Sequence, residues 1–271
     1  MREEGVNIIT NTEVGKDIAV EMIMNDYDAV CIAIGSQQPR DLKVEGRNLK
    51  GIHFAMDYLT QQNKVNYGKN IPVKSRISAK DLNVLVIGGG DTGSDCVGTA
   101  RRQGAKHITQ IEILPKPPVE RAPDNPWPYY ARILKTSSSH EEGCERRWGL
   151  ATIKFIGENG KVSRTMVEKV EWNAGSTSTS NPMSIPGSEE LIHTDLVLLA
   201  MGFVHPVHEG LLTELGIQYD KRNNIKVSSG YQTNTTKIFA AGDAVSGASL
   251  VVRAIKSGRR AAEEIDRFLT L

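Results

Sequence analysis

The chain has 271 residues, and its 33 lysines and arginines nearly balance 32 aspartates and glutamates, so the formal net charge is +1. This balance argues against nucleic acid or an anionic membrane as partner, and no apolar run is as long as a membrane span. The three cysteines, Cys31, Cys96 and Cys144, form neither a disulfide framework nor a C-x-x-C metal or redox motif. We therefore expect a cytoplasmic α/β protein without a metal site.

Short apolar runs in the first part of the chain predict three strands, over residues 6–9, 20–24 and 28–34. The third run is the most strongly apolar and ends at Gly35. A helix is expected over 54–62. The polar stretch 63–80 indicates a crossover between domains, because glycine and proline interrupt it.

The clearest signal follows this crossover. Val84–Ile87 predicts a buried parallel strand, and a helix is expected over 91–103. The turn between them consists of Gly88, Gly89, Gly90, Asp91, Thr92 and Gly93. A strand, a glycine turn and a helix in this order are typical of a dinucleotide-binding site.

Each glycine of this turn has an expected role. Gly88 permits the tight turn, Gly90 lets the pyrophosphate approach the backbone, and Gly93 lets the helix pack closely on the strand. The helix N-terminus adds free N–H groups and the positive end of its dipole. The alternative is an ordinary glycine-rich turn without a ligand.

A strand expected over 108–114 completes the first half of a nucleotide-binding domain. Glu112 lies near its end, 19 residues after Gly93 (112 − 93 = 19). A carboxylate there accepts a hydrogen bond from the ribose 2′-hydroxyl and repels a 2′-phosphate, which favours NADH over NADPH. Two alternatives stay open: Glu112 points to solvent, or nearby Lys116 and Arg121 contact a phosphate.

Residues 115–147 are rich in proline and charge and predict a long loop. Antiparallel strands are expected over 151–156 and 162–172, followed by a loop over 173–187. Further strands are expected over 195–200, near residue 218, over 225–227 and over 238–241. The chain ends in a helix expected over 249–269. Its predicted apolar face consists of Val252, Ile255, Ala262, Ile265 and Phe268 or Leu269.

Gly35, Gly202 and Gly242 each end a buried-looking strand, and together with the glycine turn they form an ordered pattern. In this pattern the chain resembles the two-dinucleotide-binding flavoprotein oxidoreductases and, within them, the family of glutamate synthase small subunits. The resemblance is carried by Val86–Asp95, Leu114–Pro118, Asn125–Pro128, His140–Glu142, Ala240–Ala244 and Ser249–Ile255.

The resemblance implies a Rossmann-like NAD(P)-binding domain, residues 75–194, inserted into an FAD-binding domain made of residues 1–74 and 195–271. Members of the family begin with a cysteine-rich iron–sulfur segment and a first glycine fingerprint for FAD, and this sequence contains neither. We therefore expect an N-terminally truncated chain without an iron–sulfur cluster. Its incomplete FAD domain should expose apolar surface and bind FAD weakly.

The resemblance also assigns residues to the flavin. Asp243, after Gly242, would accept a hydrogen bond from a flavin-side hydroxyl, and the strand-ending Gly35 and Gly202 belong to the same cofactor-binding pattern. The helix start formed by Ser249, Leu250 and Val251 would approach the flavin or its phosphates. The alternative is that Asp243 is a turn residue held by local backbone bonds.

By resemblance, hydride passes from NAD(P)H to FAD, and electrons continue through iron–sulfur clusters to a large subunit that makes glutamate. No catalytic side chain is expected, because the cofactors carry the chemistry. One alternative is a truncated NAD(P)-binding module that catalyses nothing alone, and another is a related flavoprotein electron-transfer subunit with another acceptor. The sequence leaves a homo-oligomer open.

Overall fold

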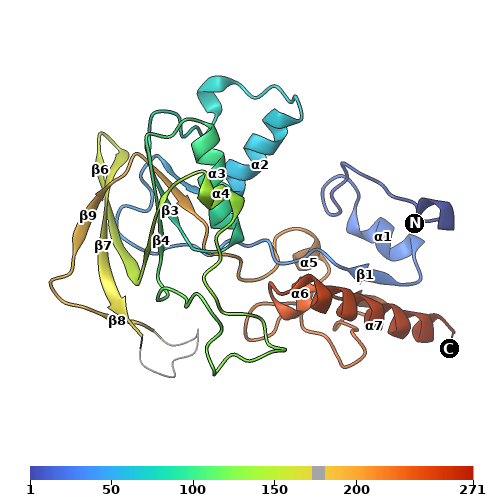
Figure 1. The fold of residues 1–271 in the computed structure, drawn as a ribbon. Helices are drawn as coiled ribbons and strands as arrows, with labels where there is room; N and C mark the ends of the chain where they lie inside the picture. The colour runs from blue at the N-terminus through green and yellow to red at the C-terminus, as the bar shows by residue number, and fades with distance from the viewer. Residues whose placement is uncertain (173–180, 271) are drawn as a thin grey trace. The chain divides into compact units, whose positions relative to one another are not determined.

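The computed structural model describes residues 1–172 and 181–270. Two compact units make up the chain: Met1–Arg40 with Phe203–Leu271, and Asp41–Gly202 (Figure 1). The divisions at 40/41 and 202/203 differ from the expected domain boundaries at 74/75 and 194/195. They differ because two segments expected in the FAD-binding domain, 52–54 and 196–199, pair into the sheet that contains the first nucleotide-binding strand.

The larger unit contains a five-stranded sheet in the order β2-β10-β3-β4-β5, in which every neighbouring pair is parallel. Its strands are β2 (Ile52–Phe54), β3 (Asn83–Ile87), β4 (His107–Glu112), β5 (Glu145–Trp148) and β10 (Leu196–Leu199). Strands β4 and β5 follow β3 on one side of it, and β10 and β2 lie on its other side. The glycine turn after β3 therefore lies where the strand order reverses, the usual ligand position in open α/β sheets.

Alternating apolar side chains place this sheet between two layers. Val84 and Val86 pack with α2 (Ala55–Asn66) and α3 (Asp91–Arg102) on one face. Leu85 and Ile87 point the other way and share a core with Phe155, Val162 and Val167 of a second sheet. The period of two along the strand produces this alternation. The α/β fold class is confirmed.

The second sheet is antiparallel. Its strands are β6 (Leu150–Glu158), β7 (Lys161–Glu171), β8 (Met183–Ser184) and β9 (Glu190–His193). Figure 1 shows this second sheet, with β6, β7 and β9 labelled. The predicted strands over 151–156 and 162–172 are confirmed. The loop expected over 173–187 is wrong at 183–184, which pair with the end of β7, while residues 173–180 lie outside the described residues.

The smaller unit has two parallel strands in its described residues, β1 (Val30–Ile32) and β11 (Ile238–Ala240). Its helices are α1 (Val20–Asp26), α5 (Leu211–Glu214), α6 (Asp243–Ser246) and α7 (Val251–Thr270). Ile32, Ile238 and Ala240 from the two strands share a core with Leu212 and Ile225. There are also two short 3₁₀ helices, Arg2–Glu4 in this unit and Val73–Ser75 in the larger one.

Four strand predictions in this unit are wrong. Residues 20–24 belong to α1, because Val20, Ile23 and Met24 follow the i, i+3, i+4 spacing of a helix, and Val20 is buried. Residues 6–9 form no strand: they are exposed, lie in irregular backbone and take no part in the β1–β11 pair. In addition, the strands expected near 218 and 225–227 reduce to an isolated bridge between Tyr219 and Ile225.

The predicted loop over 115–147 is partly wrong as well, since it contains α4 (Ser138–Glu141) and most of β5. The inward face of α7 matches the predicted one only in part: Ile265 and Phe268 are partly buried, whereas Val252, Ile255 and Ala262 are exposed. Ala261 is buried and Phe268 meets Phe239 edge-on, with the two ring centroids 5.5 Å apart. Val251 and Val252 stay about two-thirds exposed, which agrees with the expected apolar surface.

Asp195 anchors the start of the β3–β10 pair. Its Oδ2 accepts hydrogen bonds from the Asn83 backbone N–H at 2.8 Å and from Asn83 Nδ2 at 2.7 Å. Burial alone would raise the pKa of Asp195, but these bonds and His193 outweigh it and hold the pKa below the ordinary 3.8. The stabilisation is therefore present at neutral pH and is lost as the pH falls through the folded-state pKa.

We expect Asp195→Ala to lower the free energy of unfolding at pH 7 by roughly 1–2 kcal/mol, because two donors of Asn83 lose their acceptor. Urea titrations should show this loss shrinking as the pH falls from 5 towards 2. Asp266→Ala, on the exposed side of α7, is the matched control. Equal stability of the two variants at pH 7 would contradict the anchoring role.

Candidate functional site

The turn between β3 and α3 is built around close contacts that its glycines permit. Gly88 has φ +127°, and a Cβ on it would lie 2.2 Å from the Ala200 carbonyl oxygen. A Cβ on Gly93 would lie 2.2 Å from the Gly88 oxygen, so the helix packs tightly on the turn. A Cβ on Gly90, by contrast, would meet nothing within 4 Å. The backbone of the turn is thus closely packed at Gly88 and Gly93 and open at Gly90.

The peptide group between Gly88 and Gly89 is held at both ends by side chains of β4. Gln110 Nε2 donates to the Gly88 carbonyl oxygen at 2.8 Å, and the Gly89 N–H donates to Glu112 Oε2 at 2.6 Å. Gln110 and Glu112 are two residues apart on one strand and so share a face. Glu112 therefore faces the turn, and the alternative that it points to solvent is wrong.

A pocket of about 720 Å³ opens over this turn, entirely within the larger unit. Its floor includes Gly89, Gly90 and Glu112, and its walls come from 114–118 and 130–137. Four basic side chains line it: Lys116, Arg132, Lys135 and Arg146. Three carboxylates, Asp91, Glu112 and Asp124, line it as well, and Asp124 pairs with Arg132. The other three basic side chains and the open backbone at Gly90 suit an anionic ligand.

The start of α3 reinforces this preference. The helix has 12 residues and begins after Gly90, which has no side chain to occupy the first N–H groups. Asp91 and Ser94 in its first turn line the same pocket. Unpaired N–H groups and the helix dipole together favour a phosphate at this end.

Trp148 closes one side of the pocket. It ends β5, opposite Glu112 in the strand register. The Arg146 guanidinium lies 5.1 Å and Lys116 Nζ 5.2 Å from its ring centroids, both within cation–π range. A flat aromatic surface therefore stands beside two cations, next to the carboxylate expected to bind ribose.

The sequence analysis did not identify Gln110, Ser94, Ser137 and His140 as members of the site, although all four line the pocket or contact the turn. Gln110 had a usable signal in its spacing of two from Glu112 on a predicted strand, and Ser94 and His140 lie in motifs that carry the resemblance. Ser137 and His140 lie far from the turn in sequence. Only the pairing of β4 with β5 brings their segment near it.

The smaller unit brings together several residues assigned to the flavin. The Ser36 hydroxyl, next to Gly35, donates to the Asp243 carbonyl oxygen at 2.8 Å. Ser249 Oγ donates to Asp243 Oδ1, also at 2.8 Å, and so ties the approach to α7 to this carboxylate. Gly242, with φ +70°, donates its N–H to Ser257 Oγ at 3.0 Å.

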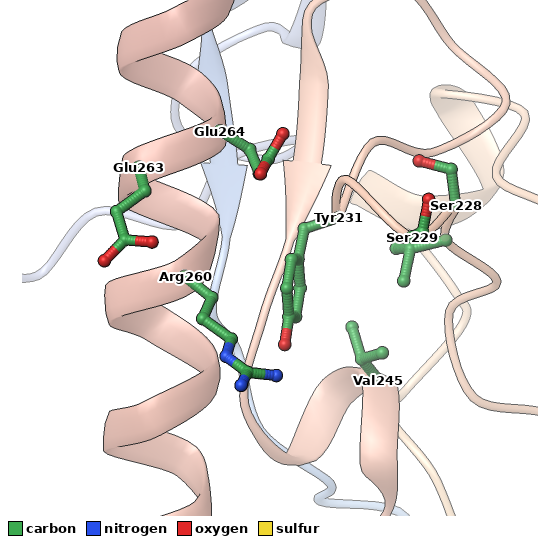
Figure 2. Close-up of a pocket in the computed structure, with 8 residues that line it drawn as sticks. Ser228, Ser229, Tyr231, Val245, Arg260, Glu263 and Glu264 are labelled. Carbon is green, nitrogen blue, oxygen red and sulfur yellow. The ribbon is translucent and has the colours of Figure 1, made fainter.

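Other residues of the predicted flavin set are placed differently. Leu250 and Val251 are exposed at the start of α7. Gly202 is the last residue of the larger unit. A pocket of about 510 Å³ beside α7 is lined by Tyr231 and Arg260 rather than by the flavin set. In Figure 2, Arg260 and Glu264 reach from the helix towards Tyr231.

Within the described residues, no group of three or more histidines, cysteines, aspartates and glutamates has the geometry to hold a metal ion. None of the described helices is both long and apolar enough to cross a bilayer.

Comparison with known proteins places this architecture among oxidoreductases. Residues 1–258 match the family model described as pyridine nucleotide-disulphide oxidoreductase. The chain is 42% identical to the "Glutamate synthase [NADPH] small chain" of Mycobacterium tuberculosis over 272 residues, which cover 99% of this chain and 55% of that protein. It is 40% identical to the "Glutamate synthase [NADH]" of Saccharomyces cerevisiae, covering 98% of this chain and 13% of that protein.

The chain thus spans about half the length of the M. tuberculosis relative. Among solved structures, M. tuberculosis FprA in complex with NADPH matches with a TM-score of 0.69 at 16% identity. The match covers 96% of this chain and 68% of that chain. At this identity the likeness supports the fold alone.

The contacts of Gly93 generate a prediction about the turn. We expect Gly93→Ala to lower the free energy of unfolding by roughly 1–3 kcal/mol, because its Cβ would overlap the Gly88 carbonyl. Alanine in place of a helical glycine ordinarily stabilises. The matched variant Gly90→Ala, with open space around its Cβ, should cost less than about 1 kcal/mol in the same urea titration. Equal losses would contradict the tight packing at Gly93.

Proposed function

The chain belongs to the pyridine nucleotide-disulphide oxidoreductase family, and from this we propose that it is the electron-input part of a glutamate synthase small-chain-type flavoprotein. In this function it binds NAD(P)H at the glycine turn of the larger unit and passes hydride to FAD. The observation that carries the proposal is the turn itself. Its peptide is clamped by β4, and its Gly90 side is open to a pocket that contains Lys116, Lys135 and Arg146 and lies at a helix N-terminus.

The pyrophosphate of the nucleotide would lie against Gly89 and Gly90, at the N-terminus of α3. The cofactor set therefore includes Asp91, Thr92 and Gly93, which form the first turn of the helix. Hydride transfer needs binding and orientation, and no acid, base or nucleophile from the protein. The catalytic contribution of this chain is accordingly one of positioning.

Among nicotinamide cofactors we favour NADH. Glu112 is bonded to Gly89 and stands at the carboxyl end of the second strand of the nucleotide-binding half, where the adenosine ribose lies in such folds. Its negative charge would repel a 2′-phosphate. Lys116 and Arg146 in the same pocket oppose this preference, since either could contact that phosphate. Relatives carry both cofactor names, NADPH and NADH.

FAD is proposed to bind at Gly35, Gly202, Gly242, Asp243 and the residues Ser249, Leu250 and Val251. Ser249 donates to the Asp243 carboxylate and Ser36 to the Asp243 backbone carbonyl oxygen, and these two bonds support a prearranged Asp243 on the smaller unit. The exposed apolar side chains at the start of α7 support weak flavin binding by this chain on its own.

Beyond the two cofactors, the proposed route continues through iron–sulfur clusters to a glutamate synthase large subunit. The M. tuberculosis relative, a small chain by name, supports this partner, and the yeast relative shows that related sequence also occurs in one long chain. Three free cysteines agree with a reducing, cytoplasmic setting. A binding module without catalysis of its own is the second candidate, favoured by the exposed surface of α7.

Gly90→Val tests the nucleotide site. Valine fits the extended backbone at Gly90, so the variant should fold, but its side chain would occupy the space needed by the pyrophosphate. We expect at least a tenfold loss of NADH affinity in a fluorescence titration. Gly258→Val, also at an uncrowded glycine, is the control. Unchanged affinity in folded Gly90→Val would refute the site.

Glu112→Gln tests the choice of cofactor. Glutamine keeps an oxygen to accept the Gly89 N–H but removes the charge that repels a 2′-phosphate. Parallel titrations should show wild type preferring NADH, and the variant losing most of that preference through stronger NADPH binding. Glu120→Gln makes the same charge change outside the pocket. Clearly tighter NADPH than NADH binding by the wild type would sink the assignment.

The visible spectrum of the purified chain separates the two candidate functions. We expect little or no bound flavin after purification and a weak flavin spectrum after addition of FAD. Bleaching of added FAD by NADH, faster than without protein, would support hydride transfer by this chain. If no flavin can be reconstituted, the binding-module function stands and unaided catalysis is untenable.

A further inference from the structure

His140 belongs to one of the motifs that carry the family resemblance, yet the proposed function assigns it nothing. It lies on α4 and lines the same pocket as Gly89 and Gly90. Its Nε2 is 2.9 Å from Gln110 Oε1, and Gln110 Nε2 is 2.8 Å from the Gly88 oxygen. A continuous chain of hydrogen bonds therefore leads from this histidine to the nucleotide-binding turn.

The partners decide which ring nitrogen carries the proton. The Ser137 backbone N–H, which can only donate, lies 3.2 Å from His140 Nδ1, so Nδ1 is an acceptor. Gln110 already uses its amide N–H on Gly88, so its oxygen needs a donor. Neutral imidazole protonated on Nε2 satisfies both contacts, and its Nδ1 can also accept from the Ser137 hydroxyl at 3.1 Å. A doubly protonated ring could donate to that hydroxyl oxygen, but it would set two donors against each other at the Ser137 backbone N–H.

The surroundings keep the ring neutral. Burial lowers the pKa of His140, and the positive charge of Arg146 on β5 lowers it further. The arginines at the far end of α3 are engaged elsewhere, since Arg101 donates to the Glu142 carbonyl oxygen and Arg102 pairs with the Glu142 carboxylate. Gln110 on β4 brings no charge.

A purely structural role explains only half of these contacts. Ser137 and His140 form a capping box at the start of α4, which accounts for the bonds on the Nδ1 side. It does not account for Nε2, which points at Gln110. Gln110 is 2% exposed, so its amide needs partners at both ends, and these are His140 and Gly88.

We propose that His140 is a positioning residue of the nucleotide site, acting through Gln110. The imidazole orients the Gln110 amide, and Gln110 then holds the Gly88 carbonyl while Glu112 holds the Gly89 N–H of the same peptide. The turn is thereby kept in the conformation that leaves Gly90 open. This role rests on the proposed function, because it concerns affinity for NADH at that turn.

The test measures NADH affinity of full-length variants by fluorescence titration. His140→Phe keeps the ring size but has no donor, and Gln110→Met keeps the shape but cannot bind Gly88. We expect both to weaken binding about tenfold, as for the loss of a buried hydrogen bond. His140→Gln should restore affinity to within about threefold of wild type, because its amide N–H replaces Nε2–H. His107→Phe, at an exposed histidine of β4, should bind like wild type.

A second readout does not depend on the nucleotide. Imidazole ¹⁵N chemical shifts of the wild type at pH 7.5 should show neutral His140 protonated on Nε2, and this signal should change in Gln110→Met. A charged ring or an Nδ1–H tautomer would overturn the proposal, even if the His140 variants fail to fold. If Gly90→Val loses NADH but folded His140→Phe binds like wild type, only the role of His140 falls. No NADH binding by the wild type would instead overturn the proposed function.

Discussion

The site depends on one clamped peptide group, the bond between Gly88 and Gly89. Two side chains of a single strand hold its carbonyl and its N–H, Gln110 from one end and Glu112 from the other. Because both bonds are partly buried, they are stronger than the same contacts in water, and a missing partner would be costly. The conformation of the turn is thus set by the neighbouring strand rather than by the glycines, which only permit it.

This arrangement links cofactor choice to structure. The carboxylate of Glu112 both supports the turn and supplies the charge that a 2′-phosphate would meet, so any residue there must satisfy two demands at once. Arg146 and Trp148 come from β5, which the parallel order places beside β4. The long excursion between these strands supplies the remaining walls. Affinity and specificity therefore arise at the carboxyl edge of one sheet, where the strand order reverses.

The smaller unit has a smaller described sheet and more exposed apolar side chains on its longest helix. Its described sheet has two strands, and its longest helix leaves several apolar side chains exposed at the end nearest the flavin residues in sequence. Asp243 is nevertheless held by two serines, since Ser36 donates to its backbone carbonyl oxygen and Ser249 donates to its carboxylate. The carboxylate is thus held in place by Ser249, whereas the apolar side chains of Leu250 and Val251, which follow in the sequence, are exposed.

The sequence alone determined the elements whose signals are local: the strand at Val84–Ile87, the glycine turn, the helix after it and the antiparallel pair. It also identified Glu112 by its spacing. It misassigned α1, because the helical spacing of Val20, Ile23 and Met24 extends over only seven residues, and it missed β5. Only the tertiary structure decided that Glu112 faces the turn and that His140 joins Gln110, because these contacts connect residues 23 and 30 positions apart. Periodicity reports which face of an element is buried, whereas the partner across a sheet depends on strand order.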